Sequence, residues 1–244
     1  MNRAPTETVD GRAGFSAPTS DGGLLAALQL GDSLFPSGGF TLSHGLETLA
    51  ERGLVRDAAT LEEWIAVTLR WQVAPSDGVA AAAAWGAGDD LGQLAEIDRL
   101  LRATKLAREP REASERTGRQ MLSTLATLAG GTLVRYRREV LMGRAPGLQP
   151  IVLGLAGRQL GIGRRETVLL LLHLYVAGCL GASLRLLDVD DVETQRIRLA
   201  LSPTLQAAAD EALAVPWKEM YACAVYTELT SMIHETATMR LFAS

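Results

Sequence analysis

The chain has 244 residues, of which 48% are hydrophobic and 21% are charged, and its formal net charge is −4. This length and hydrophobic content predict one domain with a sizeable core rather than two small ones. The sequence pI near 5.5 excludes a global basic field. No strong local basic patch stands out either, so we do not expect nucleic-acid binding.

The N-terminal residues 1–21 lack the apolar run of a signal peptide and are predicted to form a disordered leader. Cys179 and Cys223 are widely spaced within apolar helical sequence. This setting favours reduced core thiols in a cytoplasmic protein over a disulfide, with metal ligation as the alternative.

Helical periodicity begins with Leu24 and Leu28, which share one face. A Pro/Gly-rich turn that includes Gly31, Pro36 and Gly38 then interrupts it. A second helix is predicted from three leucines at helical spacing, with Gly53 as its C-terminal stop. These leucines are Leu42, Leu46 and Leu49.

The remaining patterns predict more helices, and Pro75 is expected to divide the first two of them. Asp89 and Asp90 are expected to start the third, and a basic turn is expected over Arg135 to Arg144. The predicted helices are Leu61 to Val73, Val79 to Trp85, Leu91 to Leu101, Pro110 to Leu128, Ile151 to Leu160, Arg165 to Leu187, Val192 to Leu201 and Thr204 to Ala214. Because no period-two alternation or hairpin turn occurs, the predicted fold is all-α, a single helical bundle of about ten helices.

The segment from Thr167 to Leu184 is almost wholly apolar and is long enough to span a membrane. A buried central helix of a bundle has the same composition, and no second such segment accompanies it. We therefore favour burial, and a membrane-associated helical protein is the alternative.

Ser43, His44 and Glu47 together suggest a hydrolase, which would need the three side chains to converge. On a helix, Ser43 and Glu47 share a face, whereas Ser43 and His44 point about a hundred degrees apart, so catalysis is not expected. Two hypotheses remain open: a solvated border of the leucine stripe, or a protein-docking surface.

Charged pairs at i,i+4 follow in the segment 105–121: Lys105 with Glu109, Glu112 with Arg116, and Glu115 with Arg119. Such pairs predict an exposed helix face. Asp188, Asp190, Asp191 and Glu193 form an acidic run further on. The run lacks the frame of a calcium-binding loop, so we predict an acidic helix N-terminus, with divalent-cation binding as the alternative.

Several of these segments resemble motifs of the UreF-type urease accessory proteins. The opening motif matches at Asp32, Ser33, Pro36, Gly38, Gly39, Phe40, Ser43, Gly45, Leu46 and Glu47. Later motifs match at Arg111, Glu112, Ser114, Gly118, Arg119, Pro150, Val152, Gly154, Gly161, Ala182, Arg185, Leu186 and Gln195. The terminal motif matches at Ser231, Met232, His234, Glu235, Arg240, Leu241, Phe242 and Ser244.

The chain departs from the family pattern at three places. His44 replaces a glutamine or tyrosine, and Gln149 stands where a histidine is common. The stretch LDVDDVET replaces a Pro-Leu-Gly-Gln core. This last departure leaves open a divergent all-α scaffold that no longer serves urease.

The resemblance implies a non-enzymatic accessory protein that joins a UreD/UreH-type partner to the UreG GTPase for nickel insertion into urease apoprotein. It further implies a homodimer, an all-α domain over 22–225 and a partner-binding tail over 226–244. Nickel would be handled by the complex, and the three histidines of this chain are too dispersed to predict a metal site of its own. The residues implied in partner binding are Pro36, Gly39, Phe40, Ser43, His44, Glu47, Arg119, Arg185, Gln195, His234, Arg240, Leu241 and Phe242. Glu47 and Arg185 would orient the GTPase.

Overall fold

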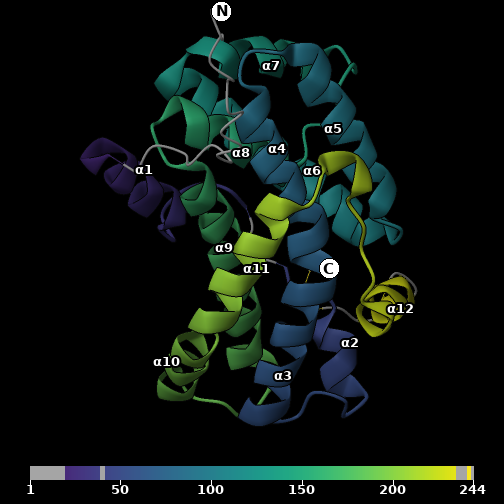
Figure 1. Ribbon diagram of the computed structural model, residues 1–244. Helices are drawn as coiled ribbons and strands as arrows, with labels where there is room; N and C mark the ends of the chain where they lie inside the picture. The colour runs from purple at the N-terminus through teal and green to yellow at the C-terminus, as the bar shows by residue number, and fades with distance from the viewer. Residues whose placement is uncertain (1–19, 39–41, 235–240, 243–244) are drawn as a thin grey trace, which may run out of the picture.

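The computed structural model describes residues 20–38, 42–234 and 241–242, and these residues form one all-α bundle (Figure 1). The predicted all-α class is confirmed. The expected leader lies outside the described residues except for Ser20 and Asp21, which begin the first helix. The Ser20 hydroxyl caps that helix by accepting a hydrogen bond from the Gly23 amide at 3.1 Å.

The helices follow one another with short connections. In chain order they are α1 (Asp21–Gly31), α2 (Leu46–Glu51), α3 (Ala58–Thr68), the π-helical segment η2 (Leu69–Gly78), α4 (Val79–Ala87), α5 (Leu91–Thr104), α6 (Arg108–Ala129), α7 (Gly131–Leu141), α8 (Gln149–Gln159), α9 (Arg164–Leu186), α10 (Asp191–Ala200), α11 (Ser202–Ala214), the short 3-10 turn η3 (Trp217–Glu219) and α12 (Val225–His234). α12 is an element that the sequence patterns did not predict.

One continuous helical rod runs from α3 through η2 into α4 (Figure 1). Inside an α-helix, proline removes one hydrogen bond and its ring clashes with the carbonyl four residues earlier. η2 widens the helix around Pro75, which has no N–H to donate to the Trp71 carbonyl four residues earlier. That carbonyl accepts a hydrogen bond from the Cys223 amide at 2.7 Å. The prediction that Pro75 divides two helices is therefore wrong.

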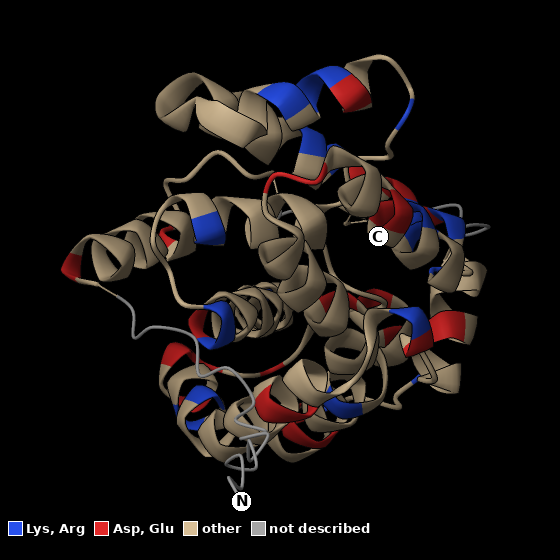
Figure 2. Cartoon of the chain, turned by 45° about the horizontal axis from the view of Figure 1, so that its top comes forward, with Lys and Arg blue, Asp and Glu red and all other residues tan. Residues whose placement is uncertain are grey.

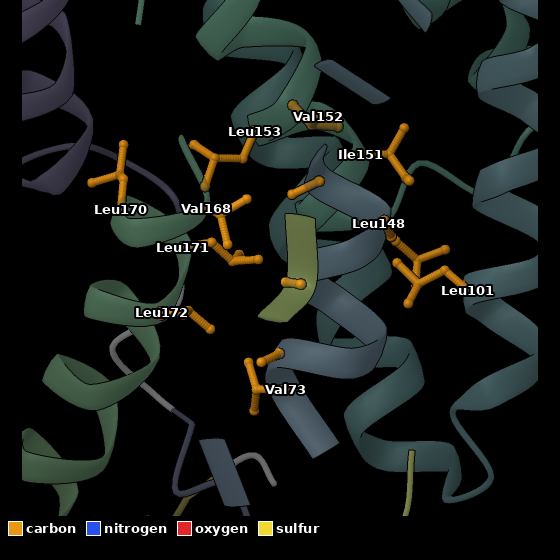
Figure 3. Close-up of a cluster of buried hydrophobic side chains, with 14 of the residues drawn as sticks. Val73, Leu101, Leu148, Ile151, Val152, Leu153, Val168, Leu170, Leu171 and Leu172 are labelled. Atoms are coloured by element: carbon orange, nitrogen blue, oxygen red, sulfur yellow. The ribbon is translucent and has the colours of Figure 1, made fainter. Parts of the chain in front are cut away.

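The centre of the bundle is the close packing of α4 against α8. α4 contributes a run of alanines, and Gly154 of α8 lies so near that an added Cβ would be 2.3 Å from the Ala81 carbonyl oxygen. Figure 3 shows the larger apolar side chains around this region, including Ile151 of α8, Val168 of α9 and Val73 of η2. All three side chains are buried, and the transfer of each from water into the core stabilises the fold by about 1.5–3 kcal/mol.

α9 contains the predicted apolar segment, and it is the one described helix long and apolar enough to cross a membrane. In the bundle, however, it packs against α1, α2, α3, α4, α8, α10, α11 and η2. Thr167, Val176 and Cys179 along its length are fully buried. These contacts agree with the prediction that this segment is a buried helix of the bundle rather than a membrane span.

Several local signals act as predicted. Asp90 caps α5, and Asp190 forms a capping box with Glu193 at the start of α10. Gly53 follows α2 with a positive φ angle of 66°, as expected, and Gly130 ends α6 with the same φ angle. The acidic run near Asp190 is thus a helix N-terminus, as expected.

Other expectations are corrected. The basic segment from Arg135 belongs to α7 rather than to a turn. Lys105 follows α5 and pairs with Asp77 at 2.8 Å instead of with Glu109, because the chain leaves the helix there. Leu24 is 55% exposed, since α1 projects from the side of the bundle, where it packs mainly on α9 (Figure 1). Cys223 is exposed, so only Cys179 is a core thiol.

A buried carboxylate holds the connection between α7 and α8. Asp98 accepts hydrogen bonds from the Tyr136 hydroxyl at 2.5 Å and from the amides of Gly147 and Leu148 at 2.6 and 3.1 Å. Desolvation raises the pKa of Asp98 to about 6, against the opposite effect of these hydrogen bonds. At Gly118, an added Cβ would lie 2.1 Å from the Gly147 carbonyl oxygen, so α6 approaches this connection too closely for any side chain.

The α4–α8 packing predicts that Gly154→Ala lowers the free energy of unfolding by roughly 1–3 kcal/mol, because the new methyl group overlaps the α4 backbone. Gly181→Ala in α9 is the matched control, since nothing lies within 4 Å of its added Cβ. The free energy of unfolding of that variant should rise by up to about 1 kcal/mol, because alanine has a higher helix propensity than glycine. Urea unfolding followed by circular dichroism measures both, and equal values for the two variants would contradict this packing.

Candidate functional site

The entry to α2 has a shape that the sequence periodicity does not predict. His44 and Gly45 have positive φ angles of 55° and 87°, so the helix begins only at Leu46. Gly45 is needed because α12 is close: an added Cβ would lie 3.2 Å from the Ser231 hydroxyl. The expected helix from Leu42 is therefore wrong, and Ser43 is buried before α2 begins.

Glu47 is also buried, which contradicts the solvated alternative for this motif. Its carboxylate oxygens accept hydrogen bonds from two backbone amides, Leu241 N at 2.7 Å and Phe242 N at 3.1 Å. The His234 ring contacts the same carboxylate through Nε2 at 3.1 Å. The opening and terminal motifs, far apart in sequence, therefore meet at Glu47.

His234 has a second carboxylate on its other side, because its Nδ1 lies 2.6 Å from Glu109 Oε2. We call Glu47, His234 and Glu109 the Glu–His–Glu network. A carboxylate only accepts hydrogen bonds, so both contacts need an N–H on the ring or a proton on one carboxyl group. The imidazole thus joins the two carboxylates inside the buried region.

Further polar contacts attach α12 to the body. The Thr227 hydroxyl accepts from the Trp64 indole at 3.2 Å, and Glu228 accepts from the Gln72 amide at 3.1 Å. The segment before α12 is bound through the Cys223 amide to the carbonyl that Pro75 releases. Burial raises the pKa of Glu228, which this site removes partly from water.

The opposite face of α12 is apolar and exposed. Tyr226 is 74% exposed and Leu229 is 51% exposed, and Leu241, which follows the helix in sequence, is 75% exposed. The other exposed members are Val225, Met232 and Ile233. We call these six side chains the α12 face, and they make an apolar patch of the kind that marks protein interaction sites.

The structure brings together only part of the predicted partner-binding set. Glu47, His234 and Phe242 share the network region, and the exposed Arg185 guanidinium lies 5.9 Å from the centre of the Phe242 ring. Phe242 is buried rather than exposed, because Glu47 holds its backbone. Gly39, Phe40 and Arg240 lie outside the described residues.

The other predicted residues lie elsewhere. Pro36 is exposed in the turn after α1, and Gln195 is exposed on α10. Arg119 forms the expected ion pair with Glu115 at 3.1 Å and donates to the Pro146 carbonyl. These positions form no single site with the Glu–His–Glu network.

The hydrolase alternative does not assemble. Glu47 is directed to His234 and the two backbone amides, while the His44 ring packs on Tyr175 with ring centres 4.6 Å apart. Among the described residues, no group of three or more His, Cys, Asp and Glu is arranged to hold a metal ion. Burial raises the pKa of the Cys179 thiol to about 12, which disfavours the thiolate needed for metal ligation.

Glu109 is the member of the network that sequence reasoning missed. It is the second residue of α6, where an acidic side chain is ordinarily explained by the helix dipole. The sequence offered one other explanation for Glu109, an i,i+4 ion pair with Lys105. That pair does not form, because Lys105 pairs with Asp77 instead.

Removal of Glu109 should loosen α12 without unfolding the bundle. In Glu109→Ala, one buried contact of His234 is lost, so the local opening free energy of α12 should fall by roughly 1–3 kcal/mol. Hydrogen exchange measured by mass spectrometry should show faster exchange in the peptide covering 225–242. The exposed Glu112→Ala in the same helix is the control, and equal exchange in both variants would refute the role of Glu109.

Two buried groups predict opposite pH dependences. Burial, aided by Lys105, lowers the pKa of His44 from 6.5 to about 4, so its contribution to stability rises by roughly 3 kcal/mol between pH 4 and 6.5. Asp98 has its pKa raised from 3.8 to about 6, so its contribution falls by a similar amount as pH rises through that interval.

Relative to the unmodified chain, His44→Gln should therefore lose stability as pH rises from about 4.5 to 6.5, and Asp98→Asn should gain it. Urea unfolding at three pH values across this interval measures the differences. Parallel stability curves for the three proteins would show that neither group titrates as described.

Comparison with known proteins agrees with the motifs. The UreF family model matches residues 55–202. The urease accessory protein UreF of Trichodesmium erythraeum is 30% identical over 90% of this chain and 96% of its own length. UreF 2 of Brucella canis is 34% identical over 90% of this chain and 91% of its own length. UreF of Cereibacter sphaeroides is 32% identical over 90% of this chain and 97% of its own length. The chain belongs to the UreF family of urease accessory proteins.

Proposed function

We propose that this chain is a cytoplasmic scaffold that joins a UreD/UreH-type accessory protein to the UreG GTPase, so that nickel reaches urease apoprotein. The observation that carries the proposal is the α12 face. One side of α12 is fixed to the body by the Glu–His–Glu network, while the other side presents Tyr226 and Leu229 to solvent, and Leu241 beyond the helix is exposed as well. A rigidly held apolar patch favours binding, because little ordering is left to be done.

The UreD/UreH-type partner is the proposed occupant of the α12 face, since the family motif S-M-x-H-E lies on this helix and R-L-F follows it. Glu47 and His234 act indirectly in this proposal, because both are buried and position the backbone of the tail. Direct contact between Glu47 and the GTPase, which the resemblance implied, does not fit this burial.

Arg185 remains the proposed contact with UreG. Its side chain is exposed at the end of α9 and lies over Phe242, so it adjoins the tail without being buried by it. A positioned guanidinium is suited to orient a GTPase without any covalent step. Regulation of GTP hydrolysis would then depend on the order of the tail.

A homodimer is part of the same proposal. α1 projects from the bundle with Leu24, Leu25 and Leu28 all more than half exposed. Charged residues of both signs are distributed over most other parts of the chain (Figure 2). The leucines of α1 therefore suit a second copy of the chain better than solvent.

The scaffold is tested by co-expression with a UreD/UreH-type protein and UreG, followed by size-exclusion chromatography. We expect one complex with the full chain, and loss of the UreD/UreH-type protein with Tyr226→Asp/Leu229→Asp or with a deletion after Ala237, because a buried carboxylate or a missing tail removes the contact. At least a tenfold weaker association is expected.

The matched control is Leu128→Asp/Leu141→Asp, which places the same charges at exposed leucines of α6 and α7. Retention of the complex by the α12 variant, or loss of it by the control, would contradict the assignment. GTP turnover by UreG in the purified complexes, compared with Arg185→Ala, tests regulation separately.

A further inference from the structure

Four exposed arginines from three separate segments meet on one surface of the bundle. Arg99 and Arg102 belong to α5, Arg119 belongs to α6, and Arg144 lies in the connection between α7 and α8. Sequence spacing does not reveal this group, because its members come from different segments. We call these four side chains the arginine cluster. It contains no residue of the α12 face or of the Glu–His–Glu network.

The connection between α7 and α8 brings the arginines of two helices together. Arg99 Nη1 donates a hydrogen bond to the Arg144 carbonyl at 2.9 Å, and Arg119 Nε donates one to the Pro146 carbonyl at 3.1 Å. These two carbonyl groups are only two residues apart. Guanidinium groups that are already held by main-chain carbonyls lose little freedom when a ligand binds.

The carboxylates of this surface compensate only part of its charge. Glu115 accepts hydrogen bonds from Arg102 at 2.7 Å and Arg119 at 3.1 Å, and Glu139 accepts two from Arg144 at 2.6 and 2.7 Å. The side chains of Glu115 and Glu139 are 14% and 21% exposed, whereas the arginines that they bind are at least half exposed. Four guanidinium groups thus cover two carboxylates, and an excess of positive charge faces solvent.

Other charges nearby do not remove this excess. Glu112 and Arg116 are both exposed on α6 and offset each other. Glu96 lies on α5, but it is about 120° around the helix from Arg102. Asp98 is fully buried, and its carboxylate is bonded to a hydroxyl and two amides rather than directed to solvent.

The cluster also keeps hydrogen-bond donors for a ligand. Within the described part of the chain, Arg102 Nη1 and Nη2 have no acceptor, and neither have Arg119 Nη1 and Arg144 Nη1. The planar fork of a guanidinium group matches the two oxygens of a carboxylate, so such groups suit an acidic ligand.

We propose that the arginine cluster binds a short acidic segment of a partner protein, whose carboxylates pair with Arg102 and its neighbours. The whole chain has a net charge of −4, so a long polyanion such as nucleic acid would be repelled by the rest of the surface. A short acidic segment needs only the local excess of positive charge. This contact is separate from the α12 face, so it adds a second interaction surface to the chain.

The test is fluorescence anisotropy of fluorescein-labelled hexaglutamate titrated with the full chain. We expect saturable binding in about 20 mM salt and at least tenfold weaker binding in about 200 mM salt, because salt screens exposed charges. Arg102→Gln should weaken binding roughly threefold, and Arg99→Gln/Arg102→Gln roughly tenfold. If the double variant does not fold, Arg102→Gln alone suffices, since Arg102 holds no main-chain carbonyl.

The matched control is Arg52→Gln/Arg56→Gln, which removes the same charge from two exposed arginines at the ends of the connection between α2 and α3. It should leave the affinity unchanged. Absence of saturable binding, or an equal loss of affinity in the control, would overturn the proposal. Tighter binding of a labelled hexathymidylate than of hexaglutamate would overturn it in favour of a nucleic-acid site.

Discussion

The released carbonyl of Trp71 is the constraint on which the rest of the site depends. Pro75 cannot donate to it, so η2 widens and the oxygen turns outward to the Cys223 amide. This bond fixes the strand-like connection that leads from η3 to α12, and the Pro75 carbonyl adds a second bond from Tyr221 N at 3.1 Å. Gln72 and Asp77 of the same widened turn line a cavity of about 330 Å³. One proline therefore provides the carbonyl groups that hold the connection to the C-terminal helix.

Two levels of packing support this arrangement. The alanines of α4 and Gly154 of α8 bring two helices close enough to form a dense centre, which holds the rod of α3, η2 and α4 in place. The outer level is polar, because α2, α6 and α12 meet through the Glu–His–Glu network rather than through large apolar contacts. A dense interior with a polar attachment at the edge suits the scaffold proposed above, in which α12 meets a partner while the core stays unchanged.

The sequence predicts well whatever depends on neighbouring residues. Gly53, Asp90 and Asp190 end or begin helices as expected, since capping is satisfied within a few residues. It predicts poorly what depends on distant partners. The helix accommodates Pro75 because the amide of residue 223 donates to the carbonyl that Pro75 leaves without a donor. Glu47 is buried beside His234, and local periodicity cannot show that these two residues lie together. The family resemblance selected Glu47 and His234, but only the structure shows that they contact each other and that Glu109 completes them.

The Glu–His–Glu network also has a consequence for synthesis of the chain on the ribosome. His234 follows Glu47 by 187 residues and Glu109 by 125, so both carboxylates emerge long before their shared partner. A domain folds largely as a unit, so α2 and α6 gain the imidazole that joins them only after residue 234 has been synthesised. Docking of α12 therefore closes contacts between segments that are synthesised far apart in time.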